Sequence, residues 1–311
     1  MKETISSNSL FHFTSKMPYL KSILTEGFLP SYCLENFDTF KFLSGGRLPG
    51  SFEMAVPMVC FCDIPLSKVK AHMTQYGHYG IGLKKDWGLT SGIAPLIYAS
   101  KDSATTRVID SSLKYCLSHP DFIRDAGIFS QFNNLLRLVR FSKPYQGPFF
   151  RRGKYLKVPV TFYNEREWRY VPEIVLSSGL AKPPDLSWLE EAIPEILSSV
   201  KDNKKRLDLE FKLNQLLRVP IRPWMESEIF NILRGKKDNL GTRLIHKMNQ
   251  MLRSSYPLLF GIEHINYVLV KDEAEIGPLF KYLRKSKYYT EIEIERLISK
   301  TLTKRQIFED F

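Results

Sequence analysis

The sequence predicts an α+β protein in which helices interrupt a β-sheet and also follow it at the C-terminus. Apolar runs rich in β-branched and aromatic residues at 9–14, 56–62 and 262–270 are typical of strands near the start, in the middle and near the end of the chain. Between these runs, apolar residues at three-four spacing predict amphipathic helices. The chain has 311 residues, 43% of them hydrophobic and 25% charged, which is enough for a sizeable core.

The predicted elements divide the chain into three parts. In order they are a strand at 9–14, a helix at 17–26, a loop at 28–52, a strand at 56–62, a helix at 68–76, a glycine-rich strand at 76–83, a short helix from 84, a strand at 94–98, helices at 105–116 and 121–139, a strand through 158–170, a helical block at 185–253, a strand at 262–270 and helices at 272–284 and 290–299. We therefore expect a core at 1–184 with a helical insert at about 101–140, then a helical insertion at 185–253. Residues 254–311 would return a strand and C-terminal helices that complete the core.

Charge and cysteine content indicate the compartment and the kind of partner. The formal net charge is +12, which favours a phosphate-bearing partner such as nucleic acid, although an acidic protein would fit as well. No apolar run reaches the roughly 20 residues needed to span a bilayer, so we expect a cytoplasmic protein that does not cross the membrane. Cys60 and Cys62 lack the spacing and the second ligand pair of a metal site, and we interpret them as half-buried strand residues with no metal.

A basic stretch with interleaved aromatic residues follows the inserted helices. No acidic residue lies between Asp125 and Glu165. The basic residues are Arg137, Arg140, Lys143, Arg151, Arg152, Lys154 and Lys157, and the aromatic ones are Phe141, Tyr145, Phe149, Phe150 and Tyr155. This pattern suits a polyanion with rings that can stack, a dinucleotide or a nucleic acid strand, and it equally suits a solvated loop.

The stretch Tyr163–Tyr170 carries the candidate chemistry. Because side chains of a strand alternate, Glu165, Glu167 and Arg169 would share one face. Such a face is costly to bury, so we expect it in a polar cleft or in solvent. An edge strand with laddered charges and an active-site strand with a Glu-x-Glu pair are both consistent with the pattern.

Taken together, several stretches resemble the AbiGi abortive phage-resistance family. The residues that carry the resemblance are His12–Thr14, Cys60–Ser67, His72, Tyr76–Leu83, Lys143–Tyr145 with Gly147, Tyr163–Tyr170 and Tyr267–Val270. The resemblance spans most of the chain outside 185–253. It implies a role in antiviral defence by abortive infection, within a toxin-antitoxin pair and with a partner toxin or antitoxin protein.

A weaker resemblance supplies a chemistry. A histidine on the first strand, a middle strand rich in aromatic residues and glycine, and a glutamate on a late strand resemble the order found in ADP-ribosyltransferase enzymes, which use NAD. This resemblance implies a split mixed β-sheet. It also implies that His12, with Thr14 beside it, holds a ribose of NAD and that Tyr76 or Tyr79 stacks on the nicotinamide.

The same resemblance gives roles to the charged residues. Glu167 would bind the nicotinamide ribose and stabilise the oxocarbenium-like state, and Glu165 would act as a general base on the acceptor. Arg151, Arg152 or Arg169 would bind the pyrophosphate.

Three functions remain open from the sequence. The first is transfer of ADP-ribose from NAD to nucleic acid or protein, or hydrolysis of NAD. The second is a non-enzymatic antitoxin or regulator that binds nucleic acid or a toxin through a basic surface. The third is an RNA-directed phosphotransferase or nuclease that uses His12 and His78. A cleft that contains both His12 and Glu167 would favour the first.

Overall fold

The fold is described from a computed structural model that covers residues 6–37, 39–40, 53–122, 124–147, 150–151, 154–155, 159–172, 187–198, 200–218, 246, 248–250 and 252–310. The strands are β1 (Ser9–Thr14), β2 (Ser31–Asn36), β3 (Glu53–Cys62), β4 (Tyr79–Lys84), β5 (Ala94–Pro95), β6 (Ile97–Ala99), β7 (Ser142–Pro144), β8 (Gln146–Gly147), β9 (Phe150–Arg151), β10 (Lys154–Tyr155), β11 (Val160–Thr161), β12 (Glu167–Tyr170), β13 (Ile265–Val270) and β14 (Thr301–Thr303). The α-helices are α1 (Met17–Glu26), α3 (Lys70–Tyr76), α4 (Lys85–Thr90), α5 (Ala104–Ser118), α6 (Ala126–Arg140), α7 (Ser187–Ser198), α8 (Asn203–Arg218), α11 (Ile276–Ser286), α12 (Glu291–Ser299) and α13 (Lys304–Asp310). Short 3₁₀ turns are η1 (Leu66–Lys68), η2 (Phe162–Glu165), η3 (Ile262–His264) and η4 (Glu273–Glu275).

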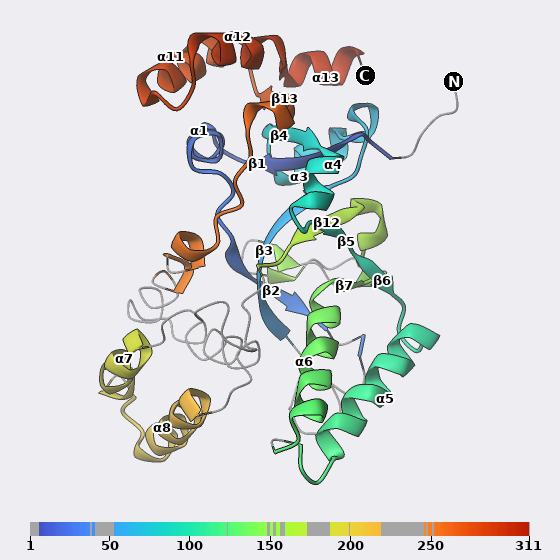
Figure 1. The fold of residues 1–311 in the computed structure, drawn as a ribbon, viewed down its shortest axis with the longest axis vertical. Coiled ribbons are helices and arrows are strands. Elements are labelled where there is room, and N and C mark those ends of the chain that lie inside the picture. Colours follow the sequence, from blue (N-terminus) through green and yellow to red (C-terminus); the bar gives the residue numbers. More distant parts are fainter. Residues whose placement is uncertain are drawn as a thin grey trace.

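The main sheet has the strand order β14-β13-β4-β1-β3-β12-β5, and β2 also pairs with β3 (Figure 1). Its pairs are antiparallel except β13 with β14, which are parallel, so the sheet is mixed. The prediction of an α+β fold with a mixed sheet is confirmed. The ADP-ribosyltransferase type of sheet and the three-part domain division stay predictions.

The sheet opens between β1 and β3. β1 pairs with β4 at six positions, from Ser9↔Lys84 to Thr14↔Tyr79, whereas β1 and β3 are in register at the single pair Phe11↔Cys62. We call β14, β13, β4 and β1 the β1 half, and β3, β12 and β5 with β2 the β3 half. The two halves diverge just beyond Phe11 and Cys62, and this opening positions the candidate site.

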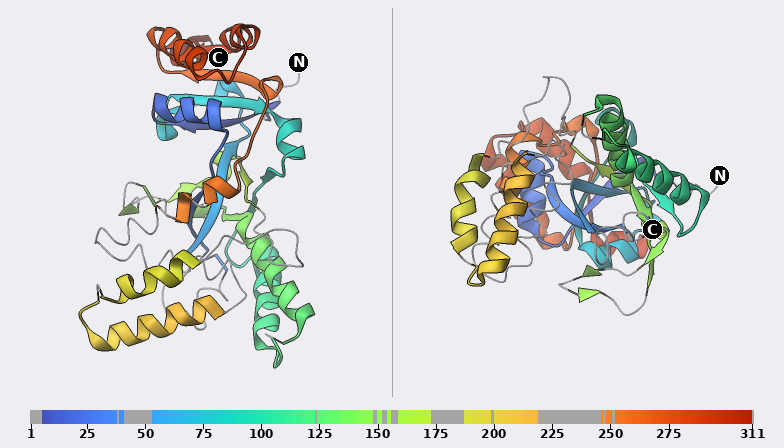
Figure 2. Two further views of the ribbon diagram at one scale, coloured as in Figure 1. Left: turned by 60° about the vertical axis from the view of Figure 1, so that its left-hand side comes forward. Right: turned by 90° about the horizontal axis from the view of Figure 1, so that it is seen from below.

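Apolar packing covers the β1 half on both faces. One core joins its strands to α1, α11 and α12 through side chains that include Leu20, Leu279 and Leu297. The other core joins the opposite face to α3 and α13 through Met73 and Ile307. The three C-terminal helices accordingly lie together across one end of the molecule (Figures 1 and 2).

The inserted helices α5 and α6 pack on each other and on the β3 half. Leu113, Phe132 and Leu136 are buried with Val56 and Met58 of β3. Each helix begins at a side-chain cap, which satisfies backbone N–H groups that a helix start leaves without partners. Ser103 accepts from Thr106 N, and Asp125 Oδ1 accepts from Gly127 N and Ile128 N at 2.8 and 3.0 Å.

Several predicted boundaries differ from the structure. Residues 28–52 were predicted to form a loop, but β2 lies within them and pairs with β3 along its whole length. The pattern of β2, Ser-Tyr-Cys-Leu-Glu-Asn, is too polar to be recognised as a strand without its partner. Of the predicted helical block 185–253, α7 and α8 are described, and most of its remainder lies outside the described residues. Within the described residues, no helix has both the length and the apolarity that a membrane span requires.

Candidate functional site

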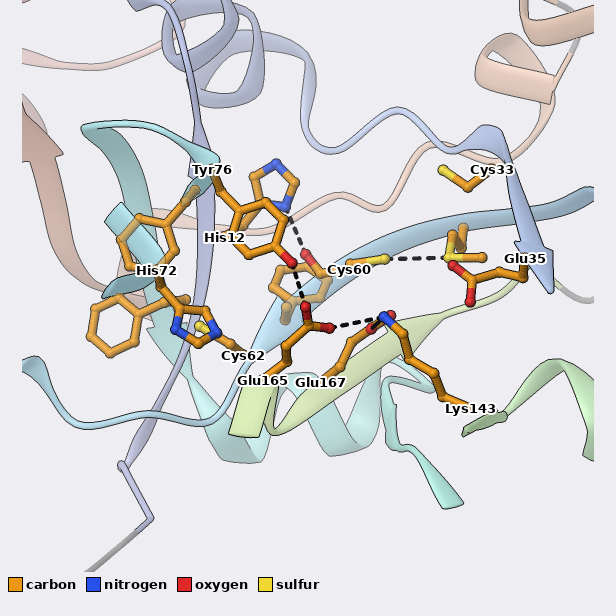
Figure 3. Close-up of a pocket in the computed structure, with 14 residues that line it drawn as sticks. His12, Cys33, Glu35, Cys60, Cys62, His72, Tyr76, Lys143, Glu165 and Glu167 are labelled. Carbon is orange, nitrogen blue, oxygen red and sulfur yellow. Dashed lines mark hydrogen bonds and ion pairs between the residues drawn. The ribbon is translucent and has the colours of Figure 1, made fainter. Parts of the chain in front are cut away.

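A pocket of about 270 Å³ lies where the two halves of the sheet diverge. Its walls come from β1, β2, β3, α3, β7, η2 and β12 (Figure 3). The lining residues are Phe11, His12, Phe13, Cys33, Glu35, Met58, Cys60, Phe61, Cys62, His72, Tyr76, Lys143, Glu165 and Glu167. Aromatic and sulfur-containing side chains thus form much of the wall, and charged side chains form one end.

Lys143 organises the charged end of the pocket. Its Nζ lies 2.8 Å from Glu165 Oε2 and 2.7 Å from Glu167 Oε2, so one ammonium group bridges the two carboxylates (Figure 3). All three side chains are buried. Buried charges are tolerated when they are paired and hydrogen-bonded, and this arrangement meets that requirement.

Arg169 is the second positively charged partner of Glu167. Its Nε donates to Glu167 Oε1 at 2.6 Å, and its Nη1 donates to the carbonyl of Arg140 at 3.0 Å. Its Nη2 is 3.0 Å from Glu35 Oε2, a close charge contact without the alignment of a hydrogen bond. Because Arg169 is 0% exposed, it serves as a counter-ion within the protein, and the predicted role of binding a pyrophosphate does not fit its position.

A turn explains how both glutamates reach Lys143. The predicted continuous strand through 163–170 is wrong for its first part, since Phe162–Glu165 form η2 and Arg166 takes a left-handed conformation with φ 44°. Arg166 itself does not line the pocket, and its Nη2 is 3.7 Å from Asp63 Oδ2. The regular strand begins at Glu167, opposite Cys62 in the register of β3 and β12.

Glu167 and Lys143 keep their charges at neutral pH. Burial by itself would raise the pKa of Glu167, but the positive charges of Arg169 and Lys143 outweigh it and hold that pKa well below its usual range. For Lys143 burial acts in the opposite direction and would lower the pKa. The neighbouring carboxylates of Glu167, Glu35 and Glu165 outweigh this effect and raise the pKa well above its ordinary value. The pocket therefore presents fixed charges.

His12 lies across the pocket from the glutamates. Its Nδ1 is 2.8 Å from the carbonyl oxygen of Cys60, and a carbonyl can only accept, so Nδ1 carries the proton and Nε2 is the acceptor of the neutral ring. Burial lowers the pKa of His12, which favours this neutral form. The ring packs edge-on against Phe28 and Phe61.

Tyr76 extends the chain of polar contacts from Glu165 to helix α3. It ends α3, is 38% exposed, and donates its hydroxyl proton to Glu165 Oε1 at 2.7 Å. Gly77 follows with φ 135°, and a Cβ there would lie 2.1 Å from the carbonyl oxygen of Thr14, so only glycine fits this close approach of α3 to β1. Burial and the Glu165 charge raise the pKa of Tyr76, which keeps the phenol protonated.

The structure brings four of the predicted site residues together. His12, Tyr76, Glu165 and Glu167 all line the pocket, although they are up to 155 positions apart in the sequence.

The other predicted site residues lie elsewhere. Tyr79 donates its hydroxyl proton to Glu275 at 2.7 Å, outside the pocket lining. Thr14 is buried and is also absent from the lining. The backbone of Arg151 belongs to β9, while the side chain of Arg151 and all of Arg152 lie outside the described residues. His78 has the charges of Lys304 and Lys271 around it and does not share the pocket with His12.

The sequence interpretation gave no site role to three polar residues of the pocket, which are Lys143, Glu35 and His72. Lys143 was noted as part of a basic stretch, but nothing indicated that it would be buried between two glutamates. Glu35 was hidden in the predicted loop. His72 lines the pocket, and its Nε2 is buried without a hydrogen-bond partner, a feature that only the three-dimensional arrangement shows. Among the described residues, no group of three His, Cys, Asp or Glu side chains is arranged to hold a metal ion.

The fold and the pocket define an α+β protein with a paired-charge pocket at a split in its sheet. Residues 26–214, more than half of the chain, match the family model described as "Putative abortive phage resistance protein AbiGi, antitoxin". The chain belongs to this AbiGi family. A curated relative, "Abortive phage resistance protein AbiGi" of Lactococcus lactis subsp. cremoris, is 34% identical over 156 residues, which cover 47% of this chain and 62% of the relative. The match thus spans less than two thirds of the relative's length, and no solved structure matches the chain.

Proposed function

We propose that this protein acts in abortive phage resistance by binding NAD in the pocket and breaking its N-glycosidic bond. The observation that carries the proposal is the meeting of His12 and Glu167 in one pocket, together with Tyr76. Trp168, the bulky residue next to Glu167, does not line the pocket, so its side chain does not occupy the space that NAD would need. A pocket of about 270 Å³ suits the nicotinamide and ribose end of NAD, with the remainder of the molecule outside.

The charge of the pocket wall supports this chemistry. In the charge network at this end of the pocket, Glu35, Glu165 and Glu167 carry three formal negative charges, and Lys143 with Arg169 behind it carries two positive ones, so the formal net charge is −1. When nicotinamide leaves NAD, positive charge develops on the ribose. A carboxylate that is already fixed in place stabilises that charge without reorganisation at the moment of reaction.

The polar contacts suit the two glutamates to different roles, Glu167 to charge stabilisation and Glu165 to proton transfer. Glu167 is held by Lys143 and Arg169 through separate oxygens, which fixes its orientation as the stabilising carboxylate. Glu165 is held by Lys143 and by the phenol of Tyr76, a residue that is 38% exposed. Glu165 is therefore the better placed of the two to accept a proton from water or another acceptor. His12 offers the lone pair of Nε2 as a hydrogen-bond acceptor for a ribose hydroxyl.

The test is nicotinamide release from NAD by the purified protein, followed in the presence and absence of DNA, RNA and cell lysate. Glu167→Gln should reduce the rate at least 100-fold, because the variant keeps the shape of the side chain and loses the stabilising charge. Glu273→Gln is the matched control, since Glu273 is exposed on η4 and does not line the pocket. Release that is equal in both variants, or release that is absent throughout alongside no NAD binding by calorimetry, would overturn the proposal.

A second candidate function is favoured by the family description, which names an antitoxin. In this function the protein neutralises a toxin protein, and the pocket has a structural role. Co-expression with a candidate toxin protein distinguishes the two, because a neutralising role survives Glu167→Gln provided that the variant folds. Loss of protection in that folded variant would favour the enzymatic function instead.

A further inference from the structure

Three tyrosine rings form a cluster beside the charged end of the pocket. Tyr163 lies between the other two, with ring centroids 5.3 Å from Tyr98 and 5.7 Å from Tyr145. Tyr163 is 53% exposed and Tyr145 is 42% exposed. Exposed aromatic rings that contact one another offer more apolar surface than a single surface tyrosine. None of the three tyrosines lines the pocket itself.

Each tyrosine of the cluster is linked to a different charged residue of the pocket, Tyr98 by a hydrogen bond and the other two through the chain. The hydroxyl of Tyr98 accepts a hydrogen bond from the backbone N–H of Glu167 at 2.8 Å. Tyr163 belongs to η2, the turn that ends at Glu165. Tyr145 follows Lys143 by two residues, and its backbone N–H donates to Ala99 in the strand that carries Tyr98. The cluster and the pocket are therefore built from the same short segments, and a ligand on one lies close to the other.

The sequence around the cluster is strongly basic. From residue 126 to residue 164 there is no Asp or Glu, while seven Lys and Arg residues occur. Among them Arg137 is exposed and Arg140 and Lys143 are buried, and the side chains of the other four lie outside the described residues. Lys101 is exposed in the turn that follows β6, two residues beyond Ala99. The whole chain carries a net charge of +12. Exposed rings on a chain of net charge +12 match the two features of single-stranded nucleic acid, its stackable bases and its phosphates.

We propose that the tyrosine cluster Tyr98, Tyr145 and Tyr163 is a stacking platform for single-stranded nucleic acid, which serves as the acceptor of ADP-ribose. The role as acceptor rests on the proposed NAD chemistry, whereas the binding itself does not. An unpaired strand fits better than a duplex because its bases are free to stack on Tyr145 and Tyr163.

The transfer step balances in atoms and charge. The bond between ribose C1′ and the nicotinamide nitrogen breaks, and nicotinamide leaves as a neutral molecule with the bonding electron pair. A nitrogen or hydroxyl oxygen of the nucleic acid forms the new bond to C1′. The proton of that nucleophile passes to the Glu165 carboxylate and then to water.

Fluorescence anisotropy with a labelled single-stranded oligonucleotide, in the absence of NAD, tests the binding. Tyr163→Ala and Tyr145→Ala should each weaken binding about tenfold, since a stacked base contributes on the order of 1–3 kcal/mol. Tyr163→Phe and Tyr145→Phe keep the ring and should bind within about twofold of the wild type. Tyr288→Ala and Tyr115→Ala are the matched controls, because these tyrosines are 64% and 62% exposed and lie outside the cluster, Tyr288 just after α11 and Tyr115 on α5.

The outcomes separate this inference from the proposed function. Loss of binding in the Ala variants at the cluster alone, with binding that weakens as salt rises, supports the platform. Equal binding in all variants, or no binding by the wild type, overturns it. Nicotinamide release in water that is unchanged by Tyr163→Ala would leave the NAD chemistry standing. Transfer of ADP-ribose to a lysate protein without oligonucleotide binding would overturn the platform and identify a protein acceptor.

Discussion

Both halves of the sheet bury apolar side chains, and the β3 half also buries a network of charges. In the β1 half, Ile81 and Val268 are 0% exposed, as is Leu297 of the covering helix α12, and all three pack among apolar neighbours. In the β3 half, Arg169 is also 0% exposed, yet its neighbours are Glu167 and Glu35. Equal burial therefore does not mean equal chemistry. The β1 half gains free energy from apolar area, whereas the β3 half holds charges whose desolvation is offset only while every partner is present.

This difference predicts where the protein is sensitive to substitution. An apolar side chain that is truncated leaves a cavity, and its cost depends on how far the surroundings relax. A buried charge that loses its partner leaves an uncompensated charge, which cannot relax in the same way. The pocket lies at the boundary between the two halves, so its polar end depends on the charged half for its geometry.

The largest effect is expected for Arg169→Met. This substitution keeps the volume of the side chain and leaves Glu167 with one cationic partner and Glu35 without its contact. We expect a loss of about 3–5 kcal/mol in the free energy of unfolding, measured by urea denaturation. The double variant with Glu167→Gln should recover part of the loss, because the stranded charge is removed. A single variant as stable as the wild type would show that Arg169 is not the counter-ion described.

In the β1 half, Leu297→Ala is the matching apolar truncation. Leu297 is 0% exposed on α12, within the core that joins α1, α11 and α12. We expect a loss of about 3 kcal/mol through the transfer and cavity contributions. NAD binding by the folded variant should stay within about twofold of the wild type, because Leu297 does not line the pocket. A large loss of binding at full folding would contradict the separation of the two halves.

The charged half should also respond to pH where the apolar half does not. The folded pKa of Glu167 lies below its unfolded value of about 4.3, so its contribution is present above that value and is lost as pH falls through the folded pKa. Lys143 has a raised folded pKa, so its contribution is full below about 10.4 and is lost only as pH rises through the folded value. The contributions of Glu167 and Lys143 are therefore both full between about pH 5 and pH 10.

Urea denaturation of the wild type and of Glu167→Gln at several pH values measures this dependence. The stability advantage of the wild type should be constant near neutral pH and should shrink below about pH 4, by at most about 1.4 kcal/mol per pH unit for one proton. Leu297→Ala should show no such change in its difference from the wild type. An advantage that is the same at pH 3 and pH 7 would mean that Glu167 is not held as a buried anion.

The sequence predicts the apolar half better than the charged half, for a physical reason. Alternation and three-four spacing are local properties, and they located β1 and β13 of the β1 half, the apolar strand β3 and most helices. The site depends on contacts between distant segments. Local pattern found Glu165 and Glu167 as a pair, but it gave no sign that Lys143, about twenty residues earlier, would bridge them. It also missed the left-handed turn at Arg166, because that conformation depends on the surrounding structure.

The smallest effect compares two tyrosines that make the same bond in different halves. Tyr76 and Tyr79 each donate a hydroxyl proton to a glutamate at 2.7 Å, the first to Glu165 in the pocket and the second to Glu275 next to the β1 half. Tyr76→Phe and Tyr79→Phe should each lower the free energy of unfolding by about 1 kcal/mol, since both bonds are partly solvated. Only Tyr76→Phe releases Glu165, so it alone should alter the pH profile of nicotinamide release while leaving NAD binding to the ring intact. If Tyr79→Phe altered that profile equally, the two halves would be coupled through the sheet, and the pocket would not be the independent unit that its charge network indicates.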